Sequence, residues 1–229
     1  MPNRSVAARA NGRGVSLRVA TVLLTLGERS LNVLLLRPPA ATLRDRWTLP
    51  VGTVRKGETV DDVALRIARD AIGVPPSHLE QAGALGGAGR GSQEPAITLA
   101  YVGLVPGGTP APAGSAWMPL ADATSLAPRH RDQIDRSVSA IRARIDQQPI
   151  AFRLLPEVFT LSELQAVYEM LLGQRLHKAS FRRSLHAAAI VEATDEWRSE
   201  GRGRPAQLFR YAPPRRRRQR RGVRFDRLG

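Results

Sequence analysis

Residues 57 to 74, GETVDDVALRIARDAIGV, place acidic and cationic side chains at spacings that could serve phosphate chemistry. Glu58 stands eight residues before Arg66, and Asp70 stands four residues after it. Carboxylates on one face of a helix bind Mg²⁺, a hard cation that takes oxygen ligands, and such a metal can hold a pyrophosphate for hydrolysis. The carboxylates are few, however. The stretch therefore indicates either a metal-dependent hydrolase or a hydrolase fold whose chemistry has been removed.

The same stretch predicts a strongly amphipathic helix over residues 59 to 72, and a core-facing helix alone would explain its apolar residues. Asp62 and Asp70 each lie four residues from Arg66, within ion-pair reach. We therefore favour a structural role for Glu58 and Arg66 over a metal-binding one. Slow hydrolysis through Asp70 and Glu58 remains an alternative. The apolar face consists of Val60, Val63, Ala64, Ile67, Ala68, Ala71 and Ile72.

Short apolar runs bounded by glycine and proline predict strands around this helix, so the first domain is α+β or α/β and not all-helical. An amphipathic helix over residues 128 to 148 closes the domain, with a stripe of Ile134, Val138, Ile141 and Ile145. Residues 147 to 157, QQPIAFRLLPE, then predict a proline-punctuated linker. The predicted strands are 14–27, 30–38, 46–54, 96–107 and 116–120.

The second domain reads as two helices and a basic hairpin, which together describe a winged helix-turn-helix. Thr160 and Glu163 form a capping-box pair at the start of the first helix, and Gly173 ends it. The second helix spans residues 177 to 190, and residues 190 to 213 form a hairpin with a glycine-rich arginine loop. The first helix buries Leu161, Leu164, Val167, Tyr168 and Leu171; the second buries Phe181, Leu185 and Ala188 or Ala189.

Charge is concentrated in the second domain. The chain carries a net charge of +15, with 18 Lys and Arg against 12 Asp and Glu up to residue 150 and 17 against 8 after it. Such an excess on a small module suggests a polyanionic partner, most often nucleic acid, although it could serve solubility alone. The absence of cysteine excludes disulfides and thiolate metal sites. No stretch approaches the ~20 apolar residues of a membrane span, so we expect a soluble, cytoplasmic protein without a membrane partner.

Residues 52 to 74 resemble the signature of the Nudix hydrolases, G-x5-E-x7-R-E-U-x-E-E-x-G-U, where U is aliphatic. The chain matches it at Gly52, Glu58, Arg66 and Gly73, after WTLP. In active members the three glutamates after the arginine hold magnesium. Ile67, Asp70 and Ala71 occupy those positions here, so two of the three carboxylates are missing. The resemblance implies a Nudix fold, and because Ile67 and Ala71 continue the apolar stripe of the helix, we expect the former metal face to be packed.

Both domains together resemble the Nudix-related transcriptional regulators, the NrtR family, from about residue 15 to residue 211. The resemblance rests on RWTLPVGTV, HLEQAGALGGAGR and ITLAYVGLVP, and on FTLSELQAVYEMLLGQRLHKASFRRSL and GRGRPAQLFRY in the second domain. It departs at Val51, where the family usually has glycine, and in the GGAGRG segment. We expect an α+β Nudix-like sandwich over 15–149, a winged helix-turn-helix over 150–212, a flexible segment 1–14 and a disordered arginine-rich tail 213–229.

The resemblance implies a DNA-binding regulator, a repressor of NAD biosynthesis genes, whose degenerate Nudix domain senses ADP-ribose or a related NAD-derived nucleotide without a tightly bound metal. A diphosphate ligand needs cationic or N–H donors, and an adenine base can stack on an indole. The predicted ligand residues are Arg37, Arg46, Trp47 and Arg90. The degenerate box consists of Gly52, Glu58, Arg66, Asp70 and Gly73, with no catalytic residue.

A helix-turn-helix inserts its second helix into the major groove, and a slender glycine-arginine wing can follow the minor groove. We expect a homodimer on an inverted repeat, built largely through the first domain and associated with the nucleoid. Two alternatives remain: a magnesium-dependent ADP-ribose or nucleoside-diphosphate pyrophosphohydrolase with an accessory basic module, and a general DNA- or RNA-binding protein. The predicted DNA-binding residues are Lys178, Ser180, Arg182, Arg183 and His186 on the helix and Arg198, Arg202 and Arg204 on the wing.

Overall fold

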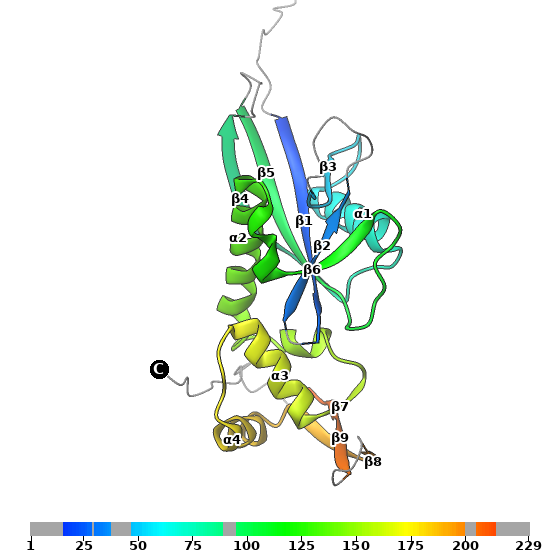
Figure 1. The fold of residues 1–229 in the computed structure, drawn as a ribbon, viewed down its shortest axis with the longest axis vertical. Helices are drawn as coiled ribbons and strands as arrows, with labels where there is room; N and C mark the ends of the chain where they lie inside the picture. Colours follow the sequence, from blue (N-terminus) through cyan, green and yellow to red (C-terminus); the bar gives the residue numbers. More distant parts are fainter. Residues whose placement is uncertain (1–15, 29, 38–46, 89–94, 200–204, 214–229) are drawn as a thin grey trace, which may run out of the picture.

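A sheet of six strands forms the upper part of the molecule in Figure 1. The computed structural model describes residues 16–28, 30–37, 47–88, 95–199 and 205–213. The strands are β1 (Ser16–Leu26), β2 (Leu31–Leu36), β3 (Val51–Thr53), β4 (His78–Ala88), β5 (Pro95–Leu104) and β6 (Ser115–Pro119). Their order is β4-β5-β1-β2-β6, and β3 pairs with the first half of β1. β1 and β5 run parallel, whereas the other pairs are antiparallel.

Two helices cover the two faces of this sheet. Alternate side chains of a strand point to opposite sides, and β1 carries apolar side chains on both. Val19 on β1 packs with Val63 and Ala64 of α1 (Val60–Ile72). Val22 belongs to the cluster that contains Ile134 of α2 (Pro128–Arg144), which follows the short 3-10 helix η1 (Leu120–Ser125). The expected α/β sandwich is confirmed. The predicted stripe of α2 is buried as well: Ile134, Val138, Ile141 and Ile145 are at most 8% exposed.

Helix α1 begins and ends where its sequence provides caps. The Thr59 hydroxyl accepts a hydrogen bond from the Asp62 backbone N–H, and the Asp62 carboxylate accepts one from the Thr59 backbone. Gly73 ends the helix with φ +77°, a left-handed conformation that glycine adopts without strain. All predicted apolar residues of this helix except the half-buried Val60 are buried.

Two strands were not predicted, and both have local reasons. β4 contains Gly83, Gly86 and Gly87, which have low strand propensity, and a bulge interrupts its pairing between Gln81 and Gly83. β7 (Val158–Thr160) has only three residues and leads directly into a helix. Each strand is held by its neighbour, β4 by β5 and β7 by the last strand of the chain, so tertiary pairing decides its conformation.

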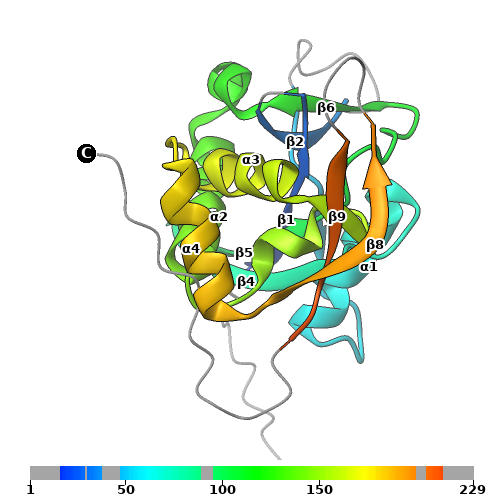
Figure 2. The same cartoon turned by 90° about the horizontal axis from the view of Figure 1, so that it is seen from below.

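The lower part of the molecule is a winged helix-turn-helix, as predicted. After β7 come α3 (Leu161–Leu172), α4 (Lys178–Ala188), β8 (Val191–Arg198) and β9 (Ala206–Tyr211), and the three strands form a sheet in the order β7-β9-β8. Thr160 and Glu163 form the expected capping box of α3. Figure 2 shows α4 and the β8–β9 hairpin on either side of α3. Within the described part of the chain, no helix is long and apolar enough to span a bilayer.

The expected linker is part of the core, which corrects the prediction for residues 147 to 157. Residues Ile150–Arg153 form a 3-10 helix, η2, and Ile150, Ala151 and Leu154 are at most 2% exposed. One cluster of buried side chains runs from Val22 and Val102 in the upper sheet to Phe159 and Phe181 in the winged helix. The proline residues therefore shape a packed junction, and the two domains share one core.

Polar contacts reinforce this junction. The Arg142 Nε–H at the end of α2 donates to the Leu171 carbonyl at the end of α3 over 2.8 Å. The Ser77 hydroxyl lies 2.6 Å from the Arg153 carbonyl, and the Gly107 N–H donates to the Leu154 carbonyl over 3.3 Å. The first bond ties α2 to α3, and the other two tie η2 and the residue after it to the segments beside β4 and β5.

Candidate functional site

The pair Glu58–Arg66 closes the loop before α1 against the helix. Arg66 Nε lies 2.7 Å from Glu58 Oε1, and its terminal nitrogen donates to Glu58 Oε2 and to the Thr53 carbonyl. The Arg55 backbone N–H also donates to Glu58 Oε2. These bonds, the one from Arg66 first and the one from Arg55 next, lower the pKa of Glu58 to about 2. Both oxygens of Glu58 are thus engaged within the chain, which favours the structural interpretation.

The expected partners of Arg66 were different. Arg66 bonds to Glu58, whereas Asp62 bonds to Thr59 in the N-terminal cap of α1. The hydrogen bonds that Arg66 donates to Glu58 are the main cause of its raised pKa, and the exposed Asp70 adds a smaller effect as a nearby charge. Helical spacing correctly predicts that Asp62 and Asp70 lie near Arg66. The residue that bonds to Arg66, Glu58, precedes the helix, where this spacing does not apply.

The residues in the two emptied glutamate positions are core residues. Ile67 is 6% exposed and packs with Val19 and Tyr101, and Ala71 is 8% exposed and packs with Leu23. Gly52 lies directly against Ile67, since a Cβ on this glycine would be 3.0 Å from Ile67 Cδ1. Magnesium requires oxygen ligands at about 2 Å in a near-octahedral arrangement. These positions do not fit the magnesium site of an active Nudix enzyme.

Among the described residues, no three His, Asp or Glu side chains converge where they could hold a metal ion.

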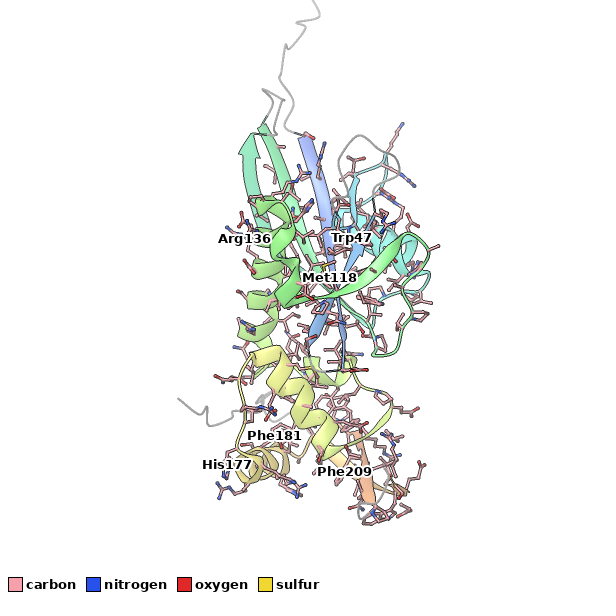
Figure 3. All side chains as sticks on the ribbon, in the orientation of Figure 1. Trp47, Met118, Arg136, His177, Phe181 and Phe209 are labelled. Carbon is pink, nitrogen blue, oxygen red and sulfur yellow. The ribbon has the colours of Figure 1, made fainter. Side chains whose placement is uncertain are left out.

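The structure brings two of the four predicted ligand residues together. Arg37, just after β2, lies with its guanidinium carbon 5.2 Å from the ring centre of Trp47, a cation–π contact. Trp47 is half-buried, and Trp47 and Met118 (both labelled in Figure 3) each pack against the core cluster that includes the stripe of α2. Arg46 and Arg90 lie outside the described residues. An arginine beside an indole combines a cation that can bind phosphate with a ring on which a base can stack.

Sequence reasoning missed a polar section of the buried face of α2. His130, Gln133 and Ser137 are at most 5% exposed and precede or interrupt the apolar stripe at helical spacing. His130 Nδ1 lies 3.3 Å from Gln133 Oε1, and burial lowers the pKa of His130, so its ring is neutral near pH 7. The Ser137 hydroxyl has no hydrogen-bond partner among the described residues. Their spacing of three and four residues, in register with the apolar stripe, is the sequence signal that would place these polar residues on the buried face of α2.

Helix α4 presents most of the predicted DNA-binding residues to solvent. Phe181 (labelled in Figure 3) and Leu185, each 1% exposed, anchor it against α3, where Phe181 meets the Tyr168 ring edge-on. Ser180 is half-buried, and its hydroxyl accepts a hydrogen bond from Arg183 over 3.2 Å. The exposed residues of the predicted set are Lys178, Arg182, Arg183 and His186.

The turn between α3 and α4 is fixed by a glutamate that sequence reasoning did not single out. Glu169 Oε1 accepts hydrogen bonds from the Leu176 backbone N–H and from Gln165, and Oε2 accepts one from Arg175. Although burial opposes it, these bonds together lower the pKa of Glu169. Glu169 therefore holds the turn that sets the direction of α4.

Of the three wing arginines predicted to bind DNA, one lies within the described part of the chain. Arg198 ends β8, and its guanidinium lies 2.7 Å from Glu163 Oε1 and 3.5 Å from the Val158 carbonyl. Its described contacts thus fasten the base of the wing to α3, because Glu163 also caps that helix. Arg202 and Arg204 lie outside the described residues.

Comparison with known proteins agrees with this architecture. The profile described as NUDIX domain matches residues 16–138, and the profile described as NrtR DNA-binding winged helix domain matches residues 151–211. The crystal structure of Shewanella oneidensis NrtR complexed with a 27mer DNA is 30% identical, with a TM-score of 0.75 over 86% of this chain and 94% of that chain. The chain belongs to the NrtR family.

A second structure and one further relative support this assignment. Another crystal structure of Shewanella oneidensis NrtR is 29% identical, with a TM-score of 0.74 over 86% of this chain and 94% of that one. The ADPR responsive transcriptional repressor NtrR of Acinetobacter baylyi is 29% identical over 203 residues, which cover 85% of this chain and 81% of the relative. The likeness to NrtR thus includes both domains and the junction between them.

Proposed function

We propose that this protein is a DNA-binding transcriptional repressor that responds to ADP-ribose or a related nucleotide bound in its Nudix domain. The observation that carries the proposal is the burial of Ile67 and Ala71 in a Nudix fold joined through one core to a winged helix. Two relatives support it: the Acinetobacter baylyi protein is named as ADPR responsive, and the Shewanella oneidensis protein was crystallised with DNA. NAD biosynthesis genes are the proposed targets.

The Nudix domain binds its ligand without cleaving it. Two of the three glutamate positions hold apolar residues of the core, and the loop glutamate, Glu58, is bonded to Arg66 and Arg55. The exposed Asp70 alone offers too few oxygens for a magnesium site. The effector is a reversibly bound nucleotide, and the protein carries no tightly bound metal.

The proposed nucleotide site uses the α2 side of the sheet. Arg37 and Trp47 supply a cation and an aromatic face, and His130 and Gln133 are buried polar residues at the beginning of α2, whose apolar stripe belongs to the cluster against which Trp47 packs. Such a combination of an aromatic surface with few polar groups suits a base and its phosphates. Arg46 and Arg90, which lie outside the described residues, complete the proposed set.

The DNA-binding surface consists of α4 and the wing. Lys178, Arg182, Arg183 and His186 are exposed on one element at the end of the molecule away from the larger sheet (Figure 1). Arginine makes bidentate hydrogen bonds to guanine in the major groove, and lysine binds phosphates. The arginine-rich tail adds contacts that do not depend on DNA sequence.

The geometry restricts the proposed homodimer. A two-fold dimer on an inverted repeat must present both copies of α4 to the same side of the duplex. β4, β5 and β1 run along the long axis, and α4 lies at one end of it (Figure 1). Pairing the outer edge of β4 with β4 of a second copy needs a two-fold axis perpendicular to the sheet, which would put the two winged helices at opposite ends. The axis that we propose therefore runs along the molecule, and as part of this proposal we place the edge of β4 outside the interface.

Cross-linking tests this arrangement. The chain has no cysteine, so Q81C on the exposed part of β4 would carry the only thiol. We expect sedimentation to show a dimer and oxidation of Q81C to leave it without a disulfide. Efficient cross-linking between two copies at this position would show that the edge of β4 does lie at the interface.

One set of measurements separates repressor from enzyme. The purified protein should bind ADP-ribose in a calorimetric titration, and with Mg²⁺ it should hydrolyse ADP-ribose at a rate far below ~1 s⁻¹, the lower end of common turnover numbers. Turnover at or above that rate would establish the hydrolase alternative. Genome-wide footprinting identifies the target genes, and equal affinity for footprinted and scrambled duplexes would favour the general nucleic-acid-binding alternative. We expect localisation in the cytoplasm on the nucleoid.

A further inference from the structure

The wing holds an exposed tryptophan on a rigid base. Trp197 is 57% exposed, the largest exposed fraction among the large apolar side chains of the described residues. Single apolar side chains on a surface are common and need no explanation. Trp197 differs because it stands two residues before the loop of the wing and because its backbone is fixed by several specific contacts.

A bulge in β8 sets the direction of this side chain. Ala193 pairs with Phe209 and Trp197 pairs with Gln207, so four residue steps on β8 face two on β9. Such insertions change the direction of the side chains that follow them. The Thr194 hydroxyl donates to the Leu208 carbonyl over 3.0 Å, and the Gln207 side chain donates to the Thr194 carbonyl over 3.4 Å. These two bonds hold the additional residues in place.

The residue after the tryptophan fastens the same strand on the other side. Arg198 lies 2.7 Å from Glu163 of α3, and neighbouring residues of a strand point to opposite faces. Trp197 is therefore directed away from α3 while its neighbour is bound to it. The backbone that carries the indole is thus held before any partner binds, so contact would cost little ordering of the strand.

The position of β8 favours DNA as the partner. β8 is the outer strand of the β7-β9-β8 sheet, and the hairpin lies with α4 at the end of the molecule away from the larger sheet (Figures 1 and 2). Asp195 and Glu196 belong to the bulge, so this part of the wing does not attract phosphates by charge. The attraction comes from the cations of α4 and from the arginines in the sequence of the wing loop. The indole would add apolar contact and one N–H donor.

We infer that Trp197 is a DNA-contact residue: its ring packs on deoxyribose at the edge of the minor groove when α4 lies in the adjacent major groove. Apolar side chains of minor-groove-binding proteins make such contacts, and aromatic rings are sequence-tolerant partners of nucleic acid. The inference rests on the proposed DNA binding. It adds a contact that depends little on salt, unlike the arginine contacts of the same surface.

The experiment uses the full chain and a duplex selected by the wild-type protein from a random pool. Trp197→Ala should weaken binding of this duplex about tenfold, equivalent to ~1.4 kcal/mol, whereas Trp197→Phe should retain most of the affinity. The matched control is Ile97→Ala, which truncates another exposed apolar residue, on β5 of the larger sheet, and should leave the affinity unchanged. The salt dependence of Trp197→Ala binding should equal that of the wild type.

A second measurement needs no destabilising substitution. Protein labelled with 5-fluorotryptophan contains three fluorinated residues, and Trp197→Phe assigns the signal of Trp197 in a ¹⁹F spectrum. Adding the duplex should shift this signal. The measurement is made on protein that retains Trp197, so it stays valid even if Trp197→Ala folds poorly. An unmoved signal, or wild-type affinity of Trp197→Ala, would overturn the inference, as would loss of self-association by Trp197→Ala without DNA. If the wild type selects no duplex at all, the proposed function fails first, and the inference with it.

Discussion

Replacing Ile67 by glutamate tests whether the former metal face of α1 is packed core. Ile67 is 6% exposed, lies among Val19, Val63 and Ala64, and touches the backbone at Gly52. Loss of a buried aliphatic side chain costs about 2–5 kcal/mol, and a carboxylate in the same place adds a desolvation cost. We expect I67E to lower the free energy of unfolding by about 3–5 kcal/mol at pH 7, against about 0.5–1.5 kcal/mol for the control I67V.

The pH dependence distinguishes a buried carboxyl from one that reaches solvent. Burial would raise the pKa of the introduced carboxyl above its unfolded value of about 4.3. The folded state would then bind the proton more tightly, so the additional penalty is absent below about pH 4 and grows as the pH rises, by ~1.4 kcal/mol for each pKa unit. I67Q has the same shape without the charge, and I67E should match it at pH 4 and be less stable at pH 7.

Urea denaturation followed by circular dichroism at pH 4 and pH 7 measures both effects. If I67E is as stable as I67Q at pH 7, the carboxyl reaches water and position 67 is not core. If I67E also gains magnesium-dependent hydrolysis of ADP-ribose, the face is still an open metal site, and the argument that this Nudix domain binds without cutting is refuted.

Three further predictions concern single contacts. E58Q should lower the free energy of unfolding at pH 7. The pKa of Glu58 is lower in the folded than in the unfolded protein, so its carboxylate stabilises the fold fully above about pH 4.5 and loses this effect as the pH falls towards 2. Acid-denaturation curves of E58Q and the wild type should therefore converge over this range. G173A should lower the free energy of unfolding, measured by urea denaturation, by about 1–2 kcal/mol, because φ is +72° and the new Cβ would lie 2.8 Å from the Arg142 guanidinium. An unchanged free energy would contradict the junction described above. E163A should cost about 1–2 kcal/mol through the lost cap of α3, whereas R198A should cost less than about 1 kcal/mol as an exposed pair; equal losses by urea denaturation would show that the wing contact, not the cap, dominates.

The helices could be predicted because their signals are local. Thr160 with Glu163, Gly73 and Gly173 mark helix ends through bonds within a few residues, and the apolar stripe of α2 repeats at helical spacing. The glycine-rich β4 could not be predicted in the same way. Its residues adopt a strand because β5 supplies the hydrogen bonds, and that partner is set only by the fold of the sheet.

The candidate sites could be predicted as neighbourhoods but not as contacts. The exposed cations of α4 follow from helical spacing once Phe181 and Leu185 face inward. The partner of Arg198 is 35 residues away in the chain, and Arg142 meets a carbonyl 29 residues away. Long-range bonds of this kind depend on the packing of α3 against the rest of the molecule, which no spacing in the sequence encodes. The same holds for the supposed linker, whose prolines suggested an extended segment although its aliphatic residues are buried.

The shared core limits how a nucleotide could change DNA binding. A ligand shifts an equilibrium only by its difference in affinity for two arrangements, and a flexible linker would make DNA binding independent of the state of the Nudix domain. Here α2 carries His130 and Gln133 at its beginning and the Arg142 contact to α3 near its end. α2, 17 residues long, thus connects the residues proposed for the nucleotide site with the winged helix, so a change in its seating on the sheet would displace α3. The two arrangements that the effector selects between are therefore expected to differ in the seating of α2 on the sheet, while the packing between α2, η2 and α3 stays constant.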